Sequence, residues 1–477
     1  MNWEMNKKNI FIIIVLLFLG ILENIIIIFG NFSYSFCCLF YALASIFNLC
    51  ITLIGMKKSK SKVFSLVELF IVLSYLFNFG QVYNKVFFKN YRGNLINALD
   101  MKSKEFRTVY TFTLNVLLVI AVFMLLYMEK ANKTIKKNRI IKSLDSNGVR
   151  RMGILTLMAT IPFEIYYLYR LLSIATVNAY EGFSSLSINS YIVQLGTFSL
   201  IGFSLIICSY SEQKIRGSVA YACAVLFYLL TMLSGSRIYG VVSICVLTYF
   251  YINLIYKPDL KKTIVLIIGG IIFLGILNSI MHVRQMGGMS VSAIITYWLN
   301  NRENNIIAAI FEEFGGSIYT TRIAMEEIPE QLNYHCGMSY IEMLTWIFPN
   351  VGGKISQLIP SVEFTMLFKT KYSYGGNYIA EMYYNFGYFS YFFAAFVGAV
   401  ISKVSEKIDE CVDEKNFTKC AFYIMGMYSA IIWVRSYVDV FPRNIIWSCI
   451  LLYIIYRAAK GKKNKGYIDD IGCNEYL

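Results

Sequence analysis

Charged residues are scarce in this chain, and histidine is scarcer still. Of the 477 residues, 15% are charged, 57% are hydrophobic and two are histidine. Apolar runs of about twenty residues recur along the chain, and a helix of that length crosses the ~30 Å hydrocarbon core of a bilayer. A soluble globular protein of this composition would expose apolar faces to water, and a β-barrel would show short alternating segments instead of continuous runs. The composition therefore predicts an all-α polytopic membrane protein.

Several signatures of soluble enzymes are also missing. The sequence has no phosphate-binding glycine loop, no Asp-x-Asp pair, no cluster with metal-ligand spacing and no nucleophile elbow. This argues against an enzyme supplied with ATP or nucleotide sugars from the cytoplasm, and we expect neither a metal nor another cofactor. The eleven cysteines fall mostly in apolar runs, where they act as small hydrophobic residues. We expect no disulfide, because Cys336 alone lies in a predicted external loop.

The apolar runs predict about twelve transmembrane helices. Their expected bounds are 10–29, 34–55, 63–80, 108–128, 153–175, 190–210, 218–234, 238–256, 263–282, 377–401, 420–438 and 444–457. The chain then divides into spans one to nine (1–282), a long loop subdomain between spans nine and ten (283–376), and spans ten to twelve with a tail (377–477).

The basic residues predict the orientation of these spans. Most of the 44 lysines and arginines fall in one set of alternating loops, including 57–62 and 130–151. Such loops face the cytoplasm, so we expect both termini there and the loop subdomain outside. The external loop 84–107 is also basic, but the loop after the next span outweighs it. Because the net charge of +15 comes largely from these loops, it does not indicate a nucleic-acid partner.

The extracytoplasmic loop subdomain reads as a series of short amphipathic helices. Its apolar residues recur at spacings of three and four, as in Ile306, Ile307, Ile310, Phe311 and Phe314. Helices of this kind lie along the outer membrane surface or cover the ends of the spans.

Arginine outnumbers lysine among the basic residues outside the cytoplasmic loops. Five of these arginines lie near the outer ends of different spans: Arg170, Arg237, Arg284, Arg435 and Arg443. Guanidinium binds phosphate oxygens in a bidentate fork, so this set predicts a site for a lipid diphosphate headgroup. Arg237 closes a tight turn, Leu233-Ser-Gly-Ser-Arg237. The alternative is that each arginine reaches the headgroups of ordinary lipids.

The predicted tenth span contains an acid, Glu381, on one helical face with Tyr384 and Asn385. A carboxylate in an apolar run is costly unless it faces the interior of the bundle. Glu381 is therefore a candidate functional residue, and we expect an arginine as its partner. The alternative is a structural ion pair between helices.

Two groups of the loop subdomain are candidates for a general base. His335 lies in the turn Tyr334-His-Cys-Gly337, and histidine titrates near neutral pH. Glu313, beside Gly315 and Gly316, is the second candidate. The other histidine, His282, stands at the start of the loop subdomain. A histidine in a loop can equally be an ordinary surface residue.

Four blocks in the C-terminal half resemble the O-antigen polysaccharide polymerase (Wzy) family. They are Leu233-Ser-Gly-Ser-Arg237, Phe311-Glu-Glu-Phe-Gly-Gly-Ser317, the stretch from Ile328-Pro to Gly337-Met-Ser-Tyr340 followed by Ile347-Phe-Pro-Asn350, and Ile379-Ala-Glu-Met-Tyr-Tyr-Asn-Phe-Gly387. The N-terminal half agrees in hydropathy alone. The resemblance implies a membrane glycosyltransferase that joins oligosaccharide repeat units carried on undecaprenyl diphosphate. It would act on the outer face of the bacterial inner membrane and make O-antigen or capsule.

With this resemblance, the residues predict a site in three parts. The five arginines bind the diphosphate, and the catalytic groups are His335, Glu313 and Glu381. The glycan is expected on Tyr378, Tyr384, Asn385 and Glu312. Expected partners are the lipid-linked oligosaccharide, membrane lipids, a chain-length regulator and a flippase.

Two other functions remain open at this point. A flippase for lipid-linked oligosaccharide would also need basic residues, but deep in central spans of two related halves. Here the candidate residues gather at one face of the membrane. An O-antigen ligase shares the outer arginines and the long loop, and sequence separates it poorly from a polymerase.

Overall fold

The structure is a computed structural model and describes residues 9–29, 32–59, 61–88, 104–128, 144–178, 189–232, 237–256, 306–348 and 375–460, with a few isolated positions between 269 and 297. The regular structure of these residues is helical. The long helices are α1 (Ile10–Phe29), α2 (Tyr34–Lys58), α3 (Leu66–Phe87), α4 (Lys104–Tyr127), α5 (Ser146–Asn178), α9 (Lys214–Met232), α10 (Arg237–Leu254), α19 (Ser390–Asp413), α20 (Phe417–Trp433) and α21 (Val440–Lys460).

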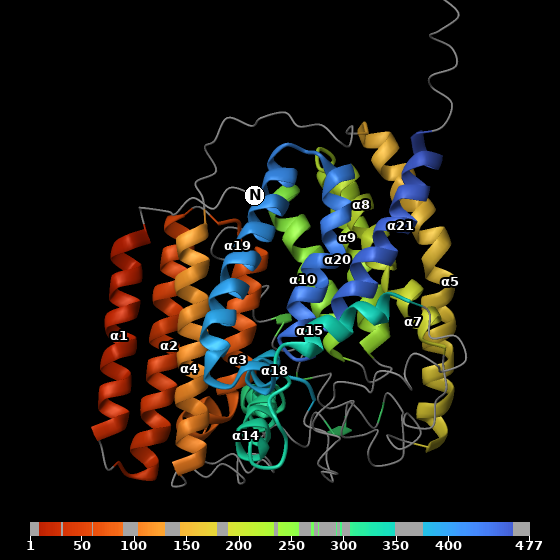
Figure 1. Cartoon of the computed structure of the whole chain (residues 1–477). Helices are drawn as coiled ribbons and strands as arrows, with labels where there is room; N and C mark the ends of the chain where they lie inside the picture. The colour runs from red at the N-terminus through yellow and green to blue at the C-terminus, as the bar shows by residue number, and fades with distance from the viewer. Residues whose placement is uncertain are drawn as a thin grey trace, which may run out of the picture.

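The helices form one bundle of roughly aligned rods (Figure 1). The first helices, α1, α2 and α4, lie at one side and α5 lies at the other, with α19, α20 and α21 between them. The paired helices α7 (Ser190–Thr197) and α8 (Ser199–Ser209) pack along α5. Large aromatic side chains, including Tyr75, Phe79 and Tyr110, fill the contacts between α3 and α4 and are fully buried.

Eight helical stretches of the described residues are long and apolar enough to cross a membrane, which confirms a multi-pass membrane protein. They are Ile10–Ile27, Tyr34–Lys58, Leu66–Phe87, Phe106–Tyr127, Ser146–Leu171, Ser190–Ser209, Lys214–Met232 and Tyr378–Asp413. The apolar helix Ile238–Leu254 is shorter. The expected count of twelve stays a prediction, and most of the expected ninth span, 263–282, lies outside the described residues.

Two expected spans are broken helices. The run 190–210 divides into α7 and α8 at Phe198. The run 377–401 contains α18 (Tyr378–Phe386), the 3₁₀ helix η6 (Gly387–Phe389) and the start of α19. At Gly387 the backbone has a φ of +55°, and an added Cβ would lie 2.8 Å from the Tyr334 ring. Only glycine fits this bend without strain.

The helices at the C-terminal side also end elsewhere than expected. α19 continues to Asp413 through the residues expected to form a basic loop, because ion pairs three residues apart, such as Lys403–Glu406 and Lys407–Glu410, form within the helix. α20 ends at Trp433 instead of 438, and residues 434–439 form a turn before α21.

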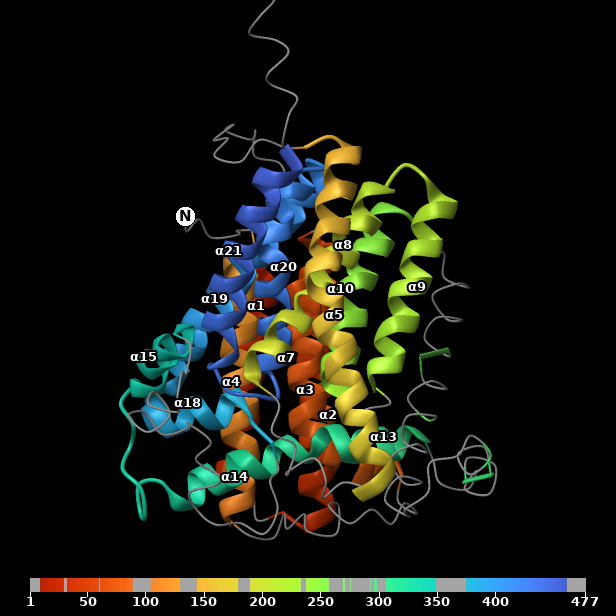
Figure 2. The ribbon, with the colours of Figure 1, turned by 90° about the vertical axis from the view of Figure 1, so that its right-hand side faces the viewer.

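The described part of the loop subdomain begins with α13 (Ile306–Phe314), η3 (Gly315–Ser317) and α14 (Ile318–Glu327), so the helix predicted from apolar spacing is confirmed. Figure 2 shows α13 and α14 across one end of the bundle, opposite the C-terminal end of α21. The backbones of η3 and α3 nearly touch at Gly315 and Gly80: a Cβ added to Gly80 would lie 2.5 Å from the carbonyl oxygen of Phe311.

A polar stripe on α3 holds this loop subdomain in place. Gln81 Nε2 donates to the carbonyl of Glu312 at 2.6 Å, and Asn84 Nδ2 donates to the carbonyl of Ala308 at 2.9 Å. One turn earlier, Asn78 Oδ1 accepts a hydrogen bond of 2.8 Å from Asn377, the N-cap residue of α18. α3 therefore fixes both α13 and the start of α18.

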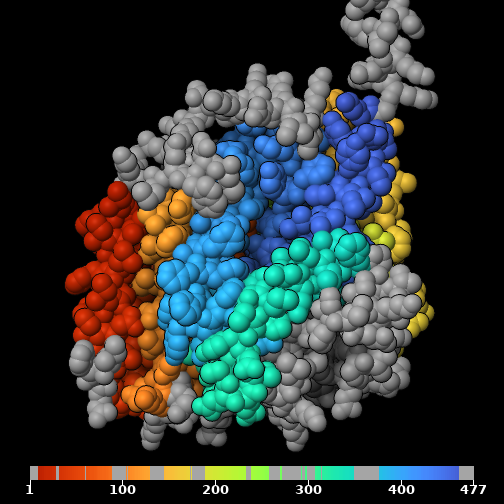
Figure 3. Space-filling view, viewed as in Figure 1, coloured from red at the N-terminus to blue at the C-terminus, as the bar shows by residue number. Residues whose placement is uncertain are grey.

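The loop subdomain then crosses the bundle. α15 (Met338–Glu342) and the 3₁₀ helix η4 (Met343–Ile347) continue from α14 across the face formed by α19, α20 and α21 (Figure 3). η4 ends on α21, where Trp447 Nε1 donates to the carbonyl of Ile347 at 2.9 Å. We call the segment 338–347 the strap.

The close approach of η3 to α3 predicts a stability effect. Gly315→Ala would place a Cβ against the backbone nitrogen of Gln81 and the backbone of Gly80, which cannot move aside as a side chain can. Overpacking of this kind costs about 1–3 kcal/mol, so we expect a lower thermal unfolding midpoint for the purified variant in detergent. Gly426→Ala on α20 is the control, because nothing lies within 4 Å of its added Cβ. Equal midpoints would contradict this packing.

Candidate functional site

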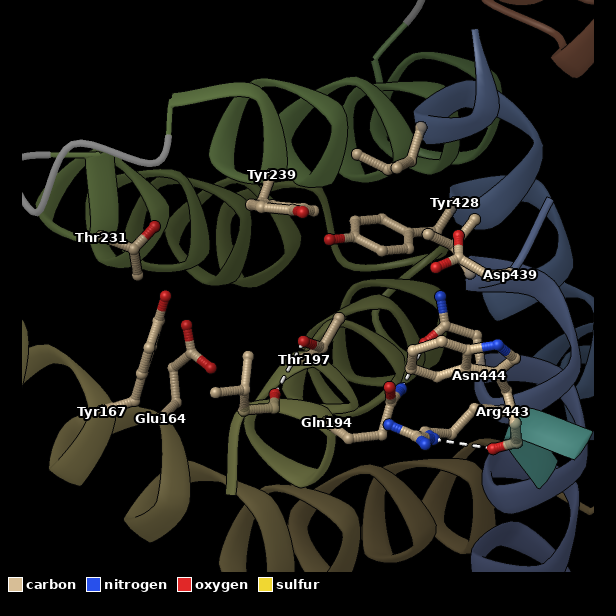
Figure 4. Close-up of a pocket in the computed structure, with 14 residues that line it drawn as sticks. Glu164, Tyr167, Gln194, Thr197, Thr231, Tyr239, Tyr428, Asp439, Arg443 and Asn444 are labelled. Carbon is tan, nitrogen blue, oxygen red and sulfur yellow. Dashed lines mark hydrogen bonds between the residues drawn. The ribbon is translucent and has the colours of Figure 1, made fainter. Parts of the chain in front are cut away.

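A cavity of about 290 Å³ lies between α5, α7, α9, α10, α20 and α21 (Figure 4). Its polar lining residues are Glu164, Tyr167, Gln194, Thr197, Thr231, Tyr239, Tyr428, Asp439, Arg443 and Asn444. Several of these residues stand at helix ends: the last turn of α9, the first turn of α10 and the start of α21. These ends are opposite to the ends that carry the lysines of the predicted cytoplasmic loops.

Glycines make room for the cavity walls. α7 packs on α5 at Gly196, where an added Cβ would overlap the Glu164 carboxylate. α10 packs on α9 at Gly240, where an added Cβ would lie 2.5 Å from Met232 Cγ. The small residues therefore let these helices approach closely, and Glu164 occupies space that a larger residue at 196 would fill.

Arg443 is a fixed cation in the cavity wall. It is 9% exposed, and its Nε donates to the carbonyl of Trp346 in the strap at 3.0 Å. Its guanidinium carbon lies 5.5 Å from the ring centre of Trp346 and 5.6 Å from that of Trp447. Neither Nη atom has a hydrogen bond to a described residue. The two indoles hold the charge without neutralising it, so the Nη atoms can bind an anion.

Amide side chains join the helices beside Arg443. Gln194 Nε2 on α7 donates to Asn444 Oδ1 on α21, and Asn444 Nδ2 donates to Ser429 Oγ on α20 at 2.8 Å. Figure 4 shows Gln194 and Asn444 on the same side of the cavity as Arg443 and Asp439. Hydrogen-bonded polar side chains from α7, α20 and α21 thus form this wall of the cavity.

Glu164 stands on the opposite side, next to Tyr167 and Thr231 (Figure 4). It is 9% exposed. Within the described residues its carboxylate has no hydrogen bond and no ion pair. The cavity therefore separates a fixed cation from a buried carboxylate.

Glu381 is fully buried and does not line the cavity. Its carboxylate accepts hydrogen bonds from Trp433 Nε1 at 3.0 Å, from the backbone nitrogen of Val438 at 3.1 Å and from Ser339 Oγ at 3.4 Å. The arginine expected as its partner is not among these donors, which are all neutral. The reason is the early end of α20, which turns the backbone N–H of Val438 toward α18. Glu381 thereby fixes the turn that leads to Asp439.

His335 ties the strap to α18. Its backbone nitrogen donates to the carbonyl of Tyr384 at 2.9 Å, and its ring stacks on the Tyr384 ring with 4.9 Å between centroids. Its Nδ1 lies 3.2 Å from Tyr384 Oη and its Nε2 lies 3.2 Å from Glu342 Oε2. Next to this pair, Asn385 Nδ2 donates to Ser339 Oγ at 2.7 Å. Three predicted site residues, His335, Tyr384 and Asn385, thus meet in one cluster, which does not line the cavity.

Of the other predicted arginines, the structure describes the side chains of Arg435 and Arg170, and neither belongs to this cluster. Arg435 lies in the turn after α20, with its guanidinium 5.6 Å from the ring centre of Phe77. Arg170 stands on α5 beyond Glu164 and does not line the cavity. Arg237 is the first residue of α10, and its side chain lies outside the described structure. Arg284, like His282, falls wholly outside the described residues.

The remaining predicted residues belong to α13 and α18. Tyr378 is buried, and its hydroxyl donates to Ser74 Oγ at 3.0 Å. Glu312 contributes its carbonyl to the contact with α3, and the side chain of Glu313 lies outside the described structure. Their predicted roles stay predictions.

Sequence reasoning missed Glu164, Asp439, Gln194 and Asn444. The signal for Glu164 was present, since it is an acid inside an apolar run, as Glu381 is. Gln194 is likewise a polar residue within an expected span. Asp439 and Asn444 stand at the start of α21 and join the cavity through tertiary packing, which local spacing does not reveal.

The sequence model of the family described as O-antigen polysaccharide polymerase Wzy matches residues 9–463, nearly the whole chain. The match reaches well beyond the C-terminal blocks that carry the resemblance in the sequence. Searches of curated proteins and of solved structures give no match to the chain. In the described part of the chain, no three His, Cys, Asp or Glu side chains are grouped so as to hold a metal ion.

Removing the Glu381 carboxylate is expected to loosen the turn between α20 and α21. Glu381→Ala leaves the buried donors of Trp433 and Val438 without an acceptor, and each such donor costs about 1–3 kcal/mol. We expect a clear drop in thermal unfolding midpoint and a changed fluorescence of Trp433. Glu326→Ala is the control, because its ion pair with Arg322 is part-exposed and contributes about 1 kcal/mol or less. If both variants unfold at the same temperature, the turn does not depend on Glu381.

Proposed function

The chain belongs to the O-antigen polysaccharide polymerase Wzy family, and from this premise we propose that it joins oligosaccharide repeat units carried on undecaprenyl diphosphate. The product is O-antigen or capsule polysaccharide. The reaction takes place on the outer face of the bacterial inner membrane, with both termini of the chain in the cytoplasm. The observation that carries this proposal is the cavity that holds Arg443.

The position of the cavity supports an outer-face reaction. Lysines stand at the ends of α2 and α21 and at the start of α9, which the positive-inside rule assigns to the cytoplasm. The cavity instead gathers the last turn of α9, the first turn of α10 and the first turn of α21. It therefore lies toward the end of the bundle that faces away from the cytoplasm.

Arg443 is suited to the diphosphate of the donor. When the glycosidic bond forms, the bond between the anomeric carbon and the phosphate oxygen breaks, and the lipid diphosphate leaves with that electron pair. A cation held in place before the reaction stabilises this charge without reorganisation. The indoles of Trp346 and Trp447 supply such a position, and the guanidinium fork matches phosphate oxygens. Arg237, at the start of α10, is the second arginine that we assign to the diphosphate.

The other cavity residues suit a glycan. Tyr167, Tyr239, Tyr428 and Trp346 present aromatic surface, and aromatic rings pack against the apolar faces of sugars. The side-chain amides of Gln194 and Asn444 carry hydrogen-bond donors and acceptors that suit sugar hydroxyls. In this proposal the cavity holds a sugar beside the diphosphate.

We assign His335 and Glu381 to positioning in this mechanism. Both ring nitrogens of His335 lie beside polar oxygens of Tyr384 and Glu342, and the Glu381 carboxylate accepts hydrogen bonds from three donors. Together they attach the strap and the turn before α21 to α18. The strap carries Trp346, and the turn leads to Arg443, so both contacts set the position of the cation.

We also propose two protein partners for this reaction. A flippase must deliver the lipid-linked repeat unit to the outer face, and a chain-length regulator would decide when polymerisation stops.

Replacing Arg443 tests the proposed site. Arg443→Lys keeps the charge but loses the fork, which removes a charge-assisted interaction of about 1.5–3 kcal/mol and slows the reaction roughly tenfold to a hundredfold. In a strain that lacks the chromosomal gene, we expect this variant to give much shorter polysaccharide at a normal protein level.

Arg322→Lys is the matched control for this change. Arg322 also lies against an aromatic ring, Phe106, and also makes a hydrogen bond, to Glu326, but it stands on α14 outside the cavity. Wild-type polymer from the Arg443 variant, or equal losses from both variants, would contradict a diphosphate site at Arg443.

A further inference from the structure

Glu164 differs from the other buried acids of this bundle. The carboxylate of Glu23 accepts hydrogen bonds from Asn48 at 3.2 and 3.3 Å, and that of Glu381 has three donors. Glu164 is 9% exposed and has no hydrogen bond to any described residue. Of the two acids that line the cavity, Asp439 lies on the Arg443 side and Glu164 lies on the opposite side.

A carboxylate buried without a donor is unfavourable, because it loses its hydration and gains nothing in return. The described residues of the surrounding helices do not supply the missing donor. α7 presents the backbone of Gly196 to the carboxylate, and a larger residue there would displace it. With no donor among the described residues, the contents of the cavity are left to supply one.

The arrangement of the cavity indicates which donor this is. Figure 4 shows Glu164 and Arg443 at opposite sides of the cavity, with Thr197 and Gln194 between them. The volume of about 290 Å³ is near the lower end of the ~300–1,000 Å³ of ligand pockets, which fits a terminal sugar better than a whole oligosaccharide. Asp439 lies on the same side of the cavity as Arg443, and its charge acts on the Arg443 guanidinium, whereas Glu164 stands across the cavity from both.

We propose that Glu164 is the catalytic base that binds the acceptor hydroxyl, an assignment that rests on the proposed polymerase function. The hydroxyl oxygen of the acceptor sugar attacks the anomeric carbon of the donor, and its proton passes to the Glu164 carboxylate. The bond from the anomeric carbon to the phosphate oxygen breaks, and the electron pair leaves on the lipid diphosphate at Arg443. The proton is then released to water, which restores the carboxylate.

This assignment predicts a selective loss of turnover. Glu164→Gln keeps the shape of the side chain against Gly196 but cannot take up a proton. Loss of a general base reduces rates by about 10²–10⁴-fold. With purified enzyme in detergent and a defined lipid-linked repeat unit, we expect kcat to fall by that factor while KM changes little. A Glu164→Gln variant that keeps more than about a tenth of the wild-type kcat would overturn the assignment.

Glu23→Gln is the matched control, because Glu23 is another buried acid of the bundle, on α1 and away from the cavity. It should retain wild-type kcat. If Glu164→Gln does not fold, Glu164→Asp is assayed instead: it keeps the base but withdraws it by one methylene, so reduced activity supports the assignment and unchanged activity contradicts it.

The outcomes also separate this inference from the function on which it rests. If Arg443→Lys is inactive and Glu164→Gln is fully active, the cavity is the site and another group takes the proton. If both variants polymerise at the wild-type rate, the cavity is not the site and both proposals fail.

Discussion

The carboxylate of Glu381 holds the two sides of the turn between α20 and α21, and the cavity depends on this contact. It accepts hydrogen bonds from the Trp433 side chain, where α20 ends, and from the backbone of Val438, just before α21 begins. α18, which carries Glu381, is in turn fixed to α3 through Asn377. A chain of buried polar contacts thus runs from α3 through α18 to the helix that carries Arg443. Buried polar groups that are fully satisfied specify one arrangement of their helices.

This arrangement solves an electrostatic problem of the proposed reaction. The enzyme needs a cation for the departing diphosphate and a base for the acceptor, yet a direct ion pair between them would neutralise both. The cavity keeps Arg443 between two indoles on one wall and Glu164 on the other. Amides, phenols and Asp439, which lies on the Arg443 side, line the rest of the cavity. The substrate itself can then join the two charges when its diphosphate and its acceptor hydroxyl are in place.

Sequence could predict the helices of this protein better than the contacts between them. Long apolar runs indicate spans because the bilayer requires them, but they do not reveal a bend such as Gly387, where hydropathy continues unbroken. Burial of Glu381 followed from its apolar surroundings, whereas its donors Trp433 and Val438 lie more than fifty residues away and emerge only from packing. Arg443 was predicted from its place at a span end and does line the cavity. Glu164, like Glu381, is an acid inside an apolar run, so the same reasoning could have identified it as a candidate.

The position of bound substrate tests the central claim most directly. The measurement is a cryo-electron microscopy structure of the protein with a lipid-linked repeat unit, using the Glu164→Gln variant to slow turnover. The account predicts diphosphate density within hydrogen-bond reach of the Arg443 Nη atoms and a sugar between Arg443 and residue 164. Density for the diphosphate beside His335 and Glu342, with the cavity empty, would contradict it.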